Sequence, residues 1–88
     1  MDIDVTHLRN PVLGWDIQST AKAAAGETIT AARIDVNGSP VYDRQISPPV
    51  NKWQQTLTQQ GQYPGENKVL VTITNDKSEQ TKTQDEWE

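Results

Sequence analysis

The feature that most constrains the fold of this chain is an unbroken run of β-branched and apolar residues, Lys-Val-Leu-Val-Thr-Ile-Thr at 68–74. Turn-forming residues precede the run at 63–67 and follow it at 75–78. No other segment combines such a run with turn signals at both ends, so it predicts a central β-strand. We expect Leu70 to point away from the core. The expected core face carries Val69, Val71 and Ile73, and across the core from it we expect Trp15, Ile34 and Trp53.

Alternation of apolar and polar residues predicts further short strands along the chain. They lie at 2–8, 15–23, 29–36, 40–42, 53–58 and 79–88. The alanine-rich part at 21–25 also fits a helix capped by Ser19 or Thr20. Such a helix would bury only alanines, and Gly26 would end it after about two turns, so we expect a strand there.

Turn residues punctuate these strands. Asn37 and Gly38 predict a tight hairpin, since both tolerate the positive φ that a type I′ turn requires. Pro40 has no amide hydrogen to donate, so it either places the returning strand at a sheet edge or lengthens the loop. The proline pair within 46–52 predicts an extended break between strands. Tyr63 occupies the place of a tyrosine corner, whose hydroxyl bonds back to nearby backbone.

About seven short strands at regular spacing, separated by turn residues, predict an all-β fold, a β-sandwich. We expect a single domain over residues 1–88. The tail at 79–88 is either a last edge strand or a frayed terminus. Its threonines and Trp87 favour a strand, which we expect to pair with the run at 68–74.

The core of this sandwich has to be thin. The chain has 88 residues, of which 33% are apolar, and it has no Phe. A domain of this size buries only about two-thirds of the surface that its unfolded chain exposes. Trp15 and Trp53 fall in register with apolar neighbours, so we expect them in the core. Trp87 lacks such neighbours and either caps the core or stays exposed.

Composition excludes several classes of protein. The chain has no cysteine, which rules out disulfides and thiolate chemistry. Its net charge is −4 and its basic residues are scattered singly, which argues against nucleic acid or an anionic membrane surface as a partner. The first ten residues lack the pattern of a secretory signal, and no later run is long enough for membrane insertion.

Residues for catalysis or metal binding are scarce. His7 is the only histidine, and we expect it to face solvent at a strand end. The carboxylates at 85–86 are interpreted as part of a solvated tail. Calcium would find oxygen ligands on loops, but no loop has the spacing of a dedicated site. The residues considered for calcium are Asp43, Asn75, Asp76 and Glu79. We therefore expect no catalytic residue, no cofactor and no resident metal.

Three segments carry a resemblance to a known family. They are Ile-Asp-Val-Asn-Gly at 34–38, Trp-Gln-Gln-Thr-Leu at 53–57, and the stretch from Gly-Glu-Asn to Asn-Asp at 65–76. They resemble bacterial immunoglobulin-like domains, in which an Asn-Gly hairpin ends a strand and a Gly-x-Asn step precedes a long apolar strand. The chain departs from that family at Lys77 and Ser78, where a Gly is common, and in its polar last strand. The resemblance supplies no catalytic residues.

The resemblance implies an immunoglobulin-like antiparallel β-sandwich of about seven short strands. It also implies a non-catalytic structural or binding module of a bacterial secreted or cell-envelope protein, and so an extracytoplasmic location. Such a module acts as a spacer or in adhesion, with a protein, a polysaccharide or neighbouring domains of a longer parent chain as its partner. The alternative is a stand-alone small binding protein, such as an inhibitor or accessory subunit of an extracytoplasmic enzyme, that uses the segment at 46–52. The candidate partner contacts are Trp87, Leu70 and Tyr42.

Overall fold

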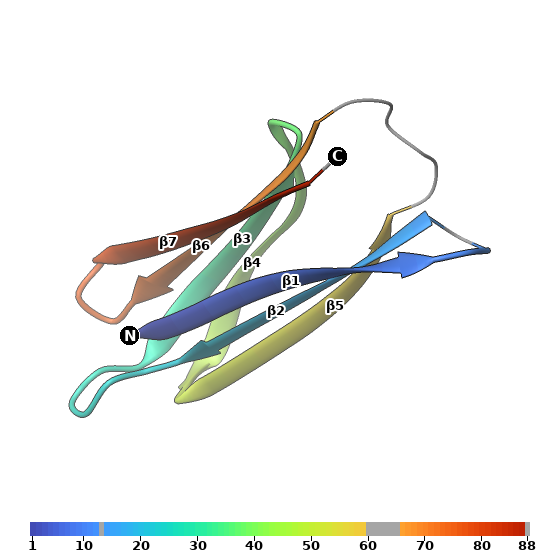
Figure 1. The fold of residues 1–88 in the computed structure, drawn as a ribbon. Coiled ribbons are helices and arrows are strands. Elements are labelled where there is room, and N and C mark those ends of the chain that lie inside the picture. The colour runs from blue at the N-terminus through green and yellow to red at the C-terminus, as the bar shows by residue number, and fades with distance from the viewer. Residues whose placement is uncertain (13, 60–65, 88) are drawn as a thin grey trace.

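The computed structural model describes residues 1–12, 14–59 and 66–87. These residues form antiparallel strands in two sheets and no helix (Figure 1). The strands are β1 (Asp2–Asn10), β2 (Gly14–Lys22), β3 (Ile29–Val36), β4 (Ser39–Val50), β5 (Lys52–Gln59), β6 (Asn67–Asn75) and β7 (Gln80–Trp87). One sheet has the order β1-β2-β5 and the other β4-β3-β6-β7. The predicted all-β sandwich is confirmed.

β6 is the predicted central strand, and it lies between β3 and β7. Its side chains Val69, Val71 and Ile73 are fully buried and share one core cluster with Trp53 of the facing sheet. The expectation for Ile34 is wrong in one respect. Ile34 pairs with Val71 within the same sheet, so the two side chains are neighbours and do not face each other across the core.

The predicted Asn-Gly hairpin joins β3 to β4. Val36 pairs with Ser39, which leaves a loop of Asn37 and Gly38. Both have positive φ, 51° and 84°, as a type I′ turn requires. The side-chain oxygen of Asn37 also accepts a hydrogen bond from the Lys68 amide at 2.8 Å. The hairpin is thereby held against the start of β6.

β4 extends further than the sequence predicts. The expected break at 46–52 does not form, because the strand continues through both prolines to Val50. Its pairing with β3 is irregular in that region, with a register shift between Ile29 and Ala31. β4 borders its sheet. Proline is tolerated on such a strand, because an amide on the free edge has no ladder hydrogen bond to lose.

The ends of β2 and β7 settle two further expectations. No helix forms at 21–25, since β2 runs to Lys22 and a turn follows. The tail pairs with β6 residue by residue, from Gln80 opposite Thr74 to Trp87 opposite Asn67. It is therefore a last strand, as the sequence favours. The expected tyrosine corner at position 63 lies outside the described residues.

The border strands of one sheet lie next to those of the other sheet, and they form two pairs. We call the first the β1–β7 side, where these two strands contact each other. The second is the β4–β5 side, where the remaining border strands lie. There Tyr42 of β4 reaches Trp53 of β5, with 5.9 Å between ring centroids. These two sides hold the three tryptophans, His7 and Tyr42.

Candidate functional site

Four side chains form a cluster that joins the two sheets at the β1–β7 side: His7, Trp15, Asp85 and Trp87. The ring of His7 stacks on Trp87, with centroids 4.0 Å and planes 11° apart. The ring also meets Trp15 nearly at right angles, with 5.4 Å between centroids. Nδ1 of His7 lies 2.5 Å from Oδ2 of Asp85. We call this group the His7 cluster.

The His7 cluster corrects two expectations. His7 does not face solvent, since only 30% of its side chain is exposed. Asp85 is not part of a solvated tail, because it lies on the inward face of β7, with 21% of its side chain exposed. Trp87 packs against the core, which is the capping alternative of the sequence analysis. Its buried Nε1 has no hydrogen-bond acceptor among the described residues.

The pairing of His7 with Asp85 supplies two of the three groups of a Ser-His-Asp site. A catalytic site of that type also needs a hydroxyl group within hydrogen-bonding reach of the other ring nitrogen of His7. Among the described residues, Asp85 is the only hydrogen-bond partner of His7. Since the imidazole also contacts two indole rings, this arrangement fits an anchor between sheets better than a catalytic dyad.

Leu70 lies on the outer face of the β4-β3-β6-β7 sheet, opposite Asp35 of β3. Together with Arg33, Asp35, Gly38 and Lys68 it lines a hollow of about 300 Å³. Arg33 donates to the Asp35 carboxylate from Nε at 3.1 Å and from Nη2 at 3.0 Å. This hydrogen bonding raises the pKa of the Arg33 guanidinium. Leu70 is half-buried among charged groups, which agrees with the outward face predicted for it.

Tyr42 is half-buried at the β4–β5 side, against Trp53. The guanidinium carbon of Arg44 lies 6.0 Å from the centroid of its ring, at the outer limit of a cation–π contact. Tyr42 therefore belongs to the border of the core. The three candidate contacts lie at the β1–β7 side, on an outer sheet face and at the β4–β5 side. They do not form one surface.

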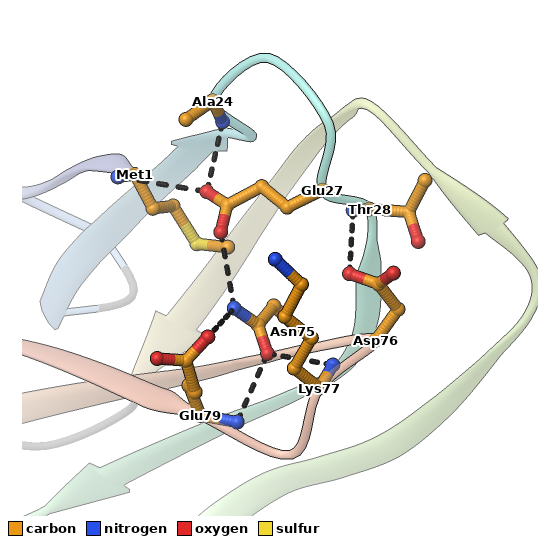
Figure 2. A network of polar contacts seen from close by, with 8 residues as sticks. All are labelled: Met1, Ala24, Glu27, Thr28, Asn75, Asp76, Lys77 and Glu79. Atoms are coloured by element: carbon orange, nitrogen blue, oxygen red, sulfur yellow. Dashed lines mark hydrogen bonds and ion pairs between the residues drawn. The ribbon is translucent and has the colours of Figure 1, made fainter.

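Three of the four residues considered for calcium meet in a polar network at one end of the sandwich (Figure 2). Their side-chain oxygens accept hydrogen bonds from this chain. Asn75 Oδ1 accepts the amides of Lys77 and Glu79, each at 2.9 Å. Asp76 Oδ1 accepts the amide of Thr28 at 3.1 Å. Asp43 lies elsewhere, opposite Arg33 in the middle of the β3–β4 pair.

Glu27 completes this network and was not singled out by the sequence. Its Oε1 accepts the amide of Ala24 at 2.8 Å, and its Oε2 accepts Nδ2 of Asn75 at 3.0 Å. The first of these hydrogen bonds, supported by the second, lowers the pKa of the Glu27 carboxyl below its ordinary value. The network joins the β2–β3 turn to the β6–β7 turn. In the described ranges, no three His, Cys, Asp or Glu residues are arranged to hold a metal ion.

Comparison of the chain with protein-family models, with curated proteins and with solved structures found no match. Over the residues that the structure describes, there is no helix of the length and apolarity needed to cross a membrane.

Proposed function

We propose that this chain is a non-catalytic β-sandwich module that acts as a spacer or a binding unit, related to the immunoglobulin-like modules of bacterial secreted or cell-envelope proteins. The observation that carries the proposal is the engagement of His7. The only histidine of the chain is stacked on Trp87 and hydrogen-bonded to Asp85. The residue best suited to acid–base chemistry at neutral pH thus serves to hold two sheets together.

The strand order gives partial support to the family part of this proposal. The described residues form a sandwich of seven antiparallel strands, an architecture that immunoglobulin-like domains also have. In the constant-type immunoglobulin domain the fourth strand belongs to the sheet of the first strand, whereas β4 here pairs with β3. The resemblance therefore extends to the architecture, and architecture alone leaves the ligand open.

The alternative of a stand-alone inhibitor is weakened by the shape of the segment assigned to it. That segment, 46–52, was expected to be an exposed loop that contacts an enzyme. Most of it lies in β4, and only Asn51 separates β4 from β5. A short turn of this kind offers little projecting surface, so we retain the spacer or binding module as the proposed function.

Turnover measurements test the non-catalytic part of the proposal. Generic ester, phosphoester and glycoside substrates should not turn over measurably with the native protein. Turnover that is lost in both the His7→Ala and the His7→Gln variants would require the imidazole, because glutamine keeps a polar side chain at position 7 but has no titratable ring. Turnover that requires the imidazole would contradict the proposal.

Chemical-shift mapping with soluble polysaccharides tests the binding part. We expect any response to be centred on the hollow at Leu70, because it combines an apolar floor with charged and hydrogen-bonding groups. Leu70→Ser should remove the response. Val12→Ser, at a site whose side chain is 85% exposed, is the matched control and should not. The absence of any response would leave the spacer role.

A further inference from the structure

β5 is a long and regular border strand. Within the described residues it pairs only with β2, so its other edge presents backbone donors and acceptors that no strand pairs with (Figure 1). One of these acceptors, the carbonyl of Thr56, takes a long hydrogen bond of 3.4 Å from the Gln55 side chain, which pairing would have to displace. The pairing with β2 runs from Lys52 to Gln59 without a register shift. The strand contains no proline, and Lys52 is its only charged residue. An edge of this kind is a template for pairing with another strand.

The other borders are protected against such pairing. β4 carries Pro40, Pro48 and Pro49 and has two register shifts against β3. β1 and β7 contact each other across the sandwich. β7 also presents charged side chains on its outward face, among them Lys82 and Glu86. Prolines, irregular pairing and charges are the usual means by which proteins block edge-to-edge association.

The sequence of β5 is complementary to itself about Gln55. In an antiparallel pair of two β5 strands with Gln55 on the two-fold axis, Trp53 lies opposite Leu57 on the inward face. On the outward face, the same register places Gln54 opposite Thr56 and Lys52 opposite Thr58. Every pair thus joins residues of the same face, and no like charges oppose each other. In this pair, the half-buried side chain of Leu57 lies beside the aromatic ring of Trp53 from the second copy.

Charges in the next strand favour the same register. Lys52 lies beside Lys22 of β2, which concentrates positive charge at one end of the outer face. At the other end Thr58 donates a hydrogen bond to Asp16 at 3.0 Å. The two-fold arrangement brings Thr58 of each copy opposite Lys52 of the other, with Asp16 one strand farther away. A hollow of about 500 Å³ at the lysine end of this sheet is lined by Lys22, Lys52 and Gln54, and also by Asp2 of β1, which lies opposite Lys22.

We propose that β5 pairs antiparallel with β5 of a second copy of this chain, about a two-fold axis at Gln55. The β1-β2-β5 sheets of the two copies then form one continuous sheet. An interface built on a single pair of strands is small, so the dimer dissociates in the micromolar range or above. This pairing does not depend on the proposed function, since a spacer and a binding unit can both dimerise.

Sedimentation velocity from micromolar to millimolar concentration, with two opposite charge substitutions, tests this register. Thr58→Lys places a lysine opposite Lys52 of the second copy and weakens dimerisation by about fivefold to tenfold, whereas Thr58→Glu strengthens it. Within one chain the effects are reversed, because position 58 lies opposite Asp16. Thr58→Lys should therefore raise monomer stability while it weakens the dimer, so unfolding cannot explain the result. Gln80→Lys, on the other sheet, is the control for net charge.

Cross-linking gives a second test that does not rely on charge, because the chain has no cysteine of its own. Gln55→Cys places one thiol opposite its own copy, and mild oxidation should yield a covalent dimer. Gln54→Cys is more exposed but lies opposite Thr56, so it should cross-link much more slowly. A chain that stays monomeric at millimolar concentration, or one bound only by an extended segment of another protein, overturns the proposal. Equal shifts for both Thr58 variants, or faster cross-linking at position 54, overturn it as well.

Discussion

The two sides of this sandwich are closed in different ways. At the β1–β7 side the border strands contact each other, and the His7 cluster adds a hydrogen bond and two ring contacts between the sheets, those of His7 and Trp15 with Trp87. At the β4–β5 side one aromatic pair, Tyr42 and Trp53, connects the borders. The first side is sealed by side chains from distant parts of the chain, and the second leaves the edge of β5 unpaired within the described residues.

This difference separates stability from interaction. A border that is covered or charged contributes to the fold and resists further pairing, as β1 and β7 do. β4 resists pairing through its prolines, although it lies at the more open side. β5 has neither protection, and apart from the Thr56 carbonyl, which the Gln55 side chain contacts at 3.4 Å, the backbone groups on its unpaired edge need water or another strand as partners. This sandwich therefore combines a thin core with one sheet edge, that of β5, which is available for an interface.

The largest effect on stability should come from the aromatic pair at the open side. Trp53 is 9% exposed and belongs to the core, so Trp53→Ala should cost about 3–5 kcal/mol. Tyr42→Ala should cost less, about 1–2 kcal/mol, because that ring is only half-buried. Urea unfolding of both variants measures the difference. Equal losses would mean that both strands of the open side contribute alike to the core.

The closed side should depend on the carboxylate that crosses it. Asp85→Ala removes the hydrogen-bond partner of His7 and should cost about 1–3 kcal/mol. Glu86→Ala is the matched control. Its side chain is 57% exposed and 3.9 Å from Lys68, so its loss should stay within about 0.5 kcal/mol. Thermal unfolding of the pair compares them, and a loss for Glu86 as large as that for Asp85 would refute the role of the His7 cluster.

The smallest effect should come from the polar network around Asn75, which lies at one end of the sandwich and serves as a reference for both sides. The pKa of Glu27 is lowered in the folded chain, mainly by its hydrogen bond from the Ala24 amide. The ionised form therefore stabilises the fold above the ordinary pKa of a glutamate, and this stability is lost as the pH falls through the lower folded value.

Urea midpoints measured across the acid range check this dependence. The native chain should lose stability more steeply below the ordinary glutamate pKa than the Glu27→Gln variant does. Near neutral pH, the urea midpoints of the native chain and of the Glu27→Gln variant should change with pH by the same amount. An identical acid limb in the two proteins would show that Glu27 does not contribute to pH dependence.

Strands that local signals define could be predicted from the sequence. The run at 68–74 became β6 because its β-branched residues are flanked by turns, and Asn37 and Gly38 formed a hairpin because both tolerate positive φ. The continuation of β4 through Pro48 and Pro49 could not be predicted in the same way. Whether a proline ends a strand depends on which edge its nitrogen faces, and that is set by the neighbouring strand.

The His7 cluster shows what local patterns leave out. His7 and Asp85 are separated by 78 positions, and no spacing rule connects them. A usable signal was present, since His7 follows Val5 by two residues and Asp85 precedes Trp87 by two, which places each on an apolar face. The only histidine was expected to face solvent because a single histidine rarely makes a catalytic or metal site. That expectation did not consider a histidine that anchors one sheet to the other.

Amide hydrogen exchange followed residue by residue tests the contrast between the two sides most directly. In dilute solution, the amides of β5 that do not face β2 should exchange rapidly, while the alternate amides that pair with β2 stay protected. At concentrations where the copies associate, the rapid set in β5 should become protected and the amides of β4 should not change. Unchanged exchange in β5 at every concentration, or new protection in β4, would contradict the account.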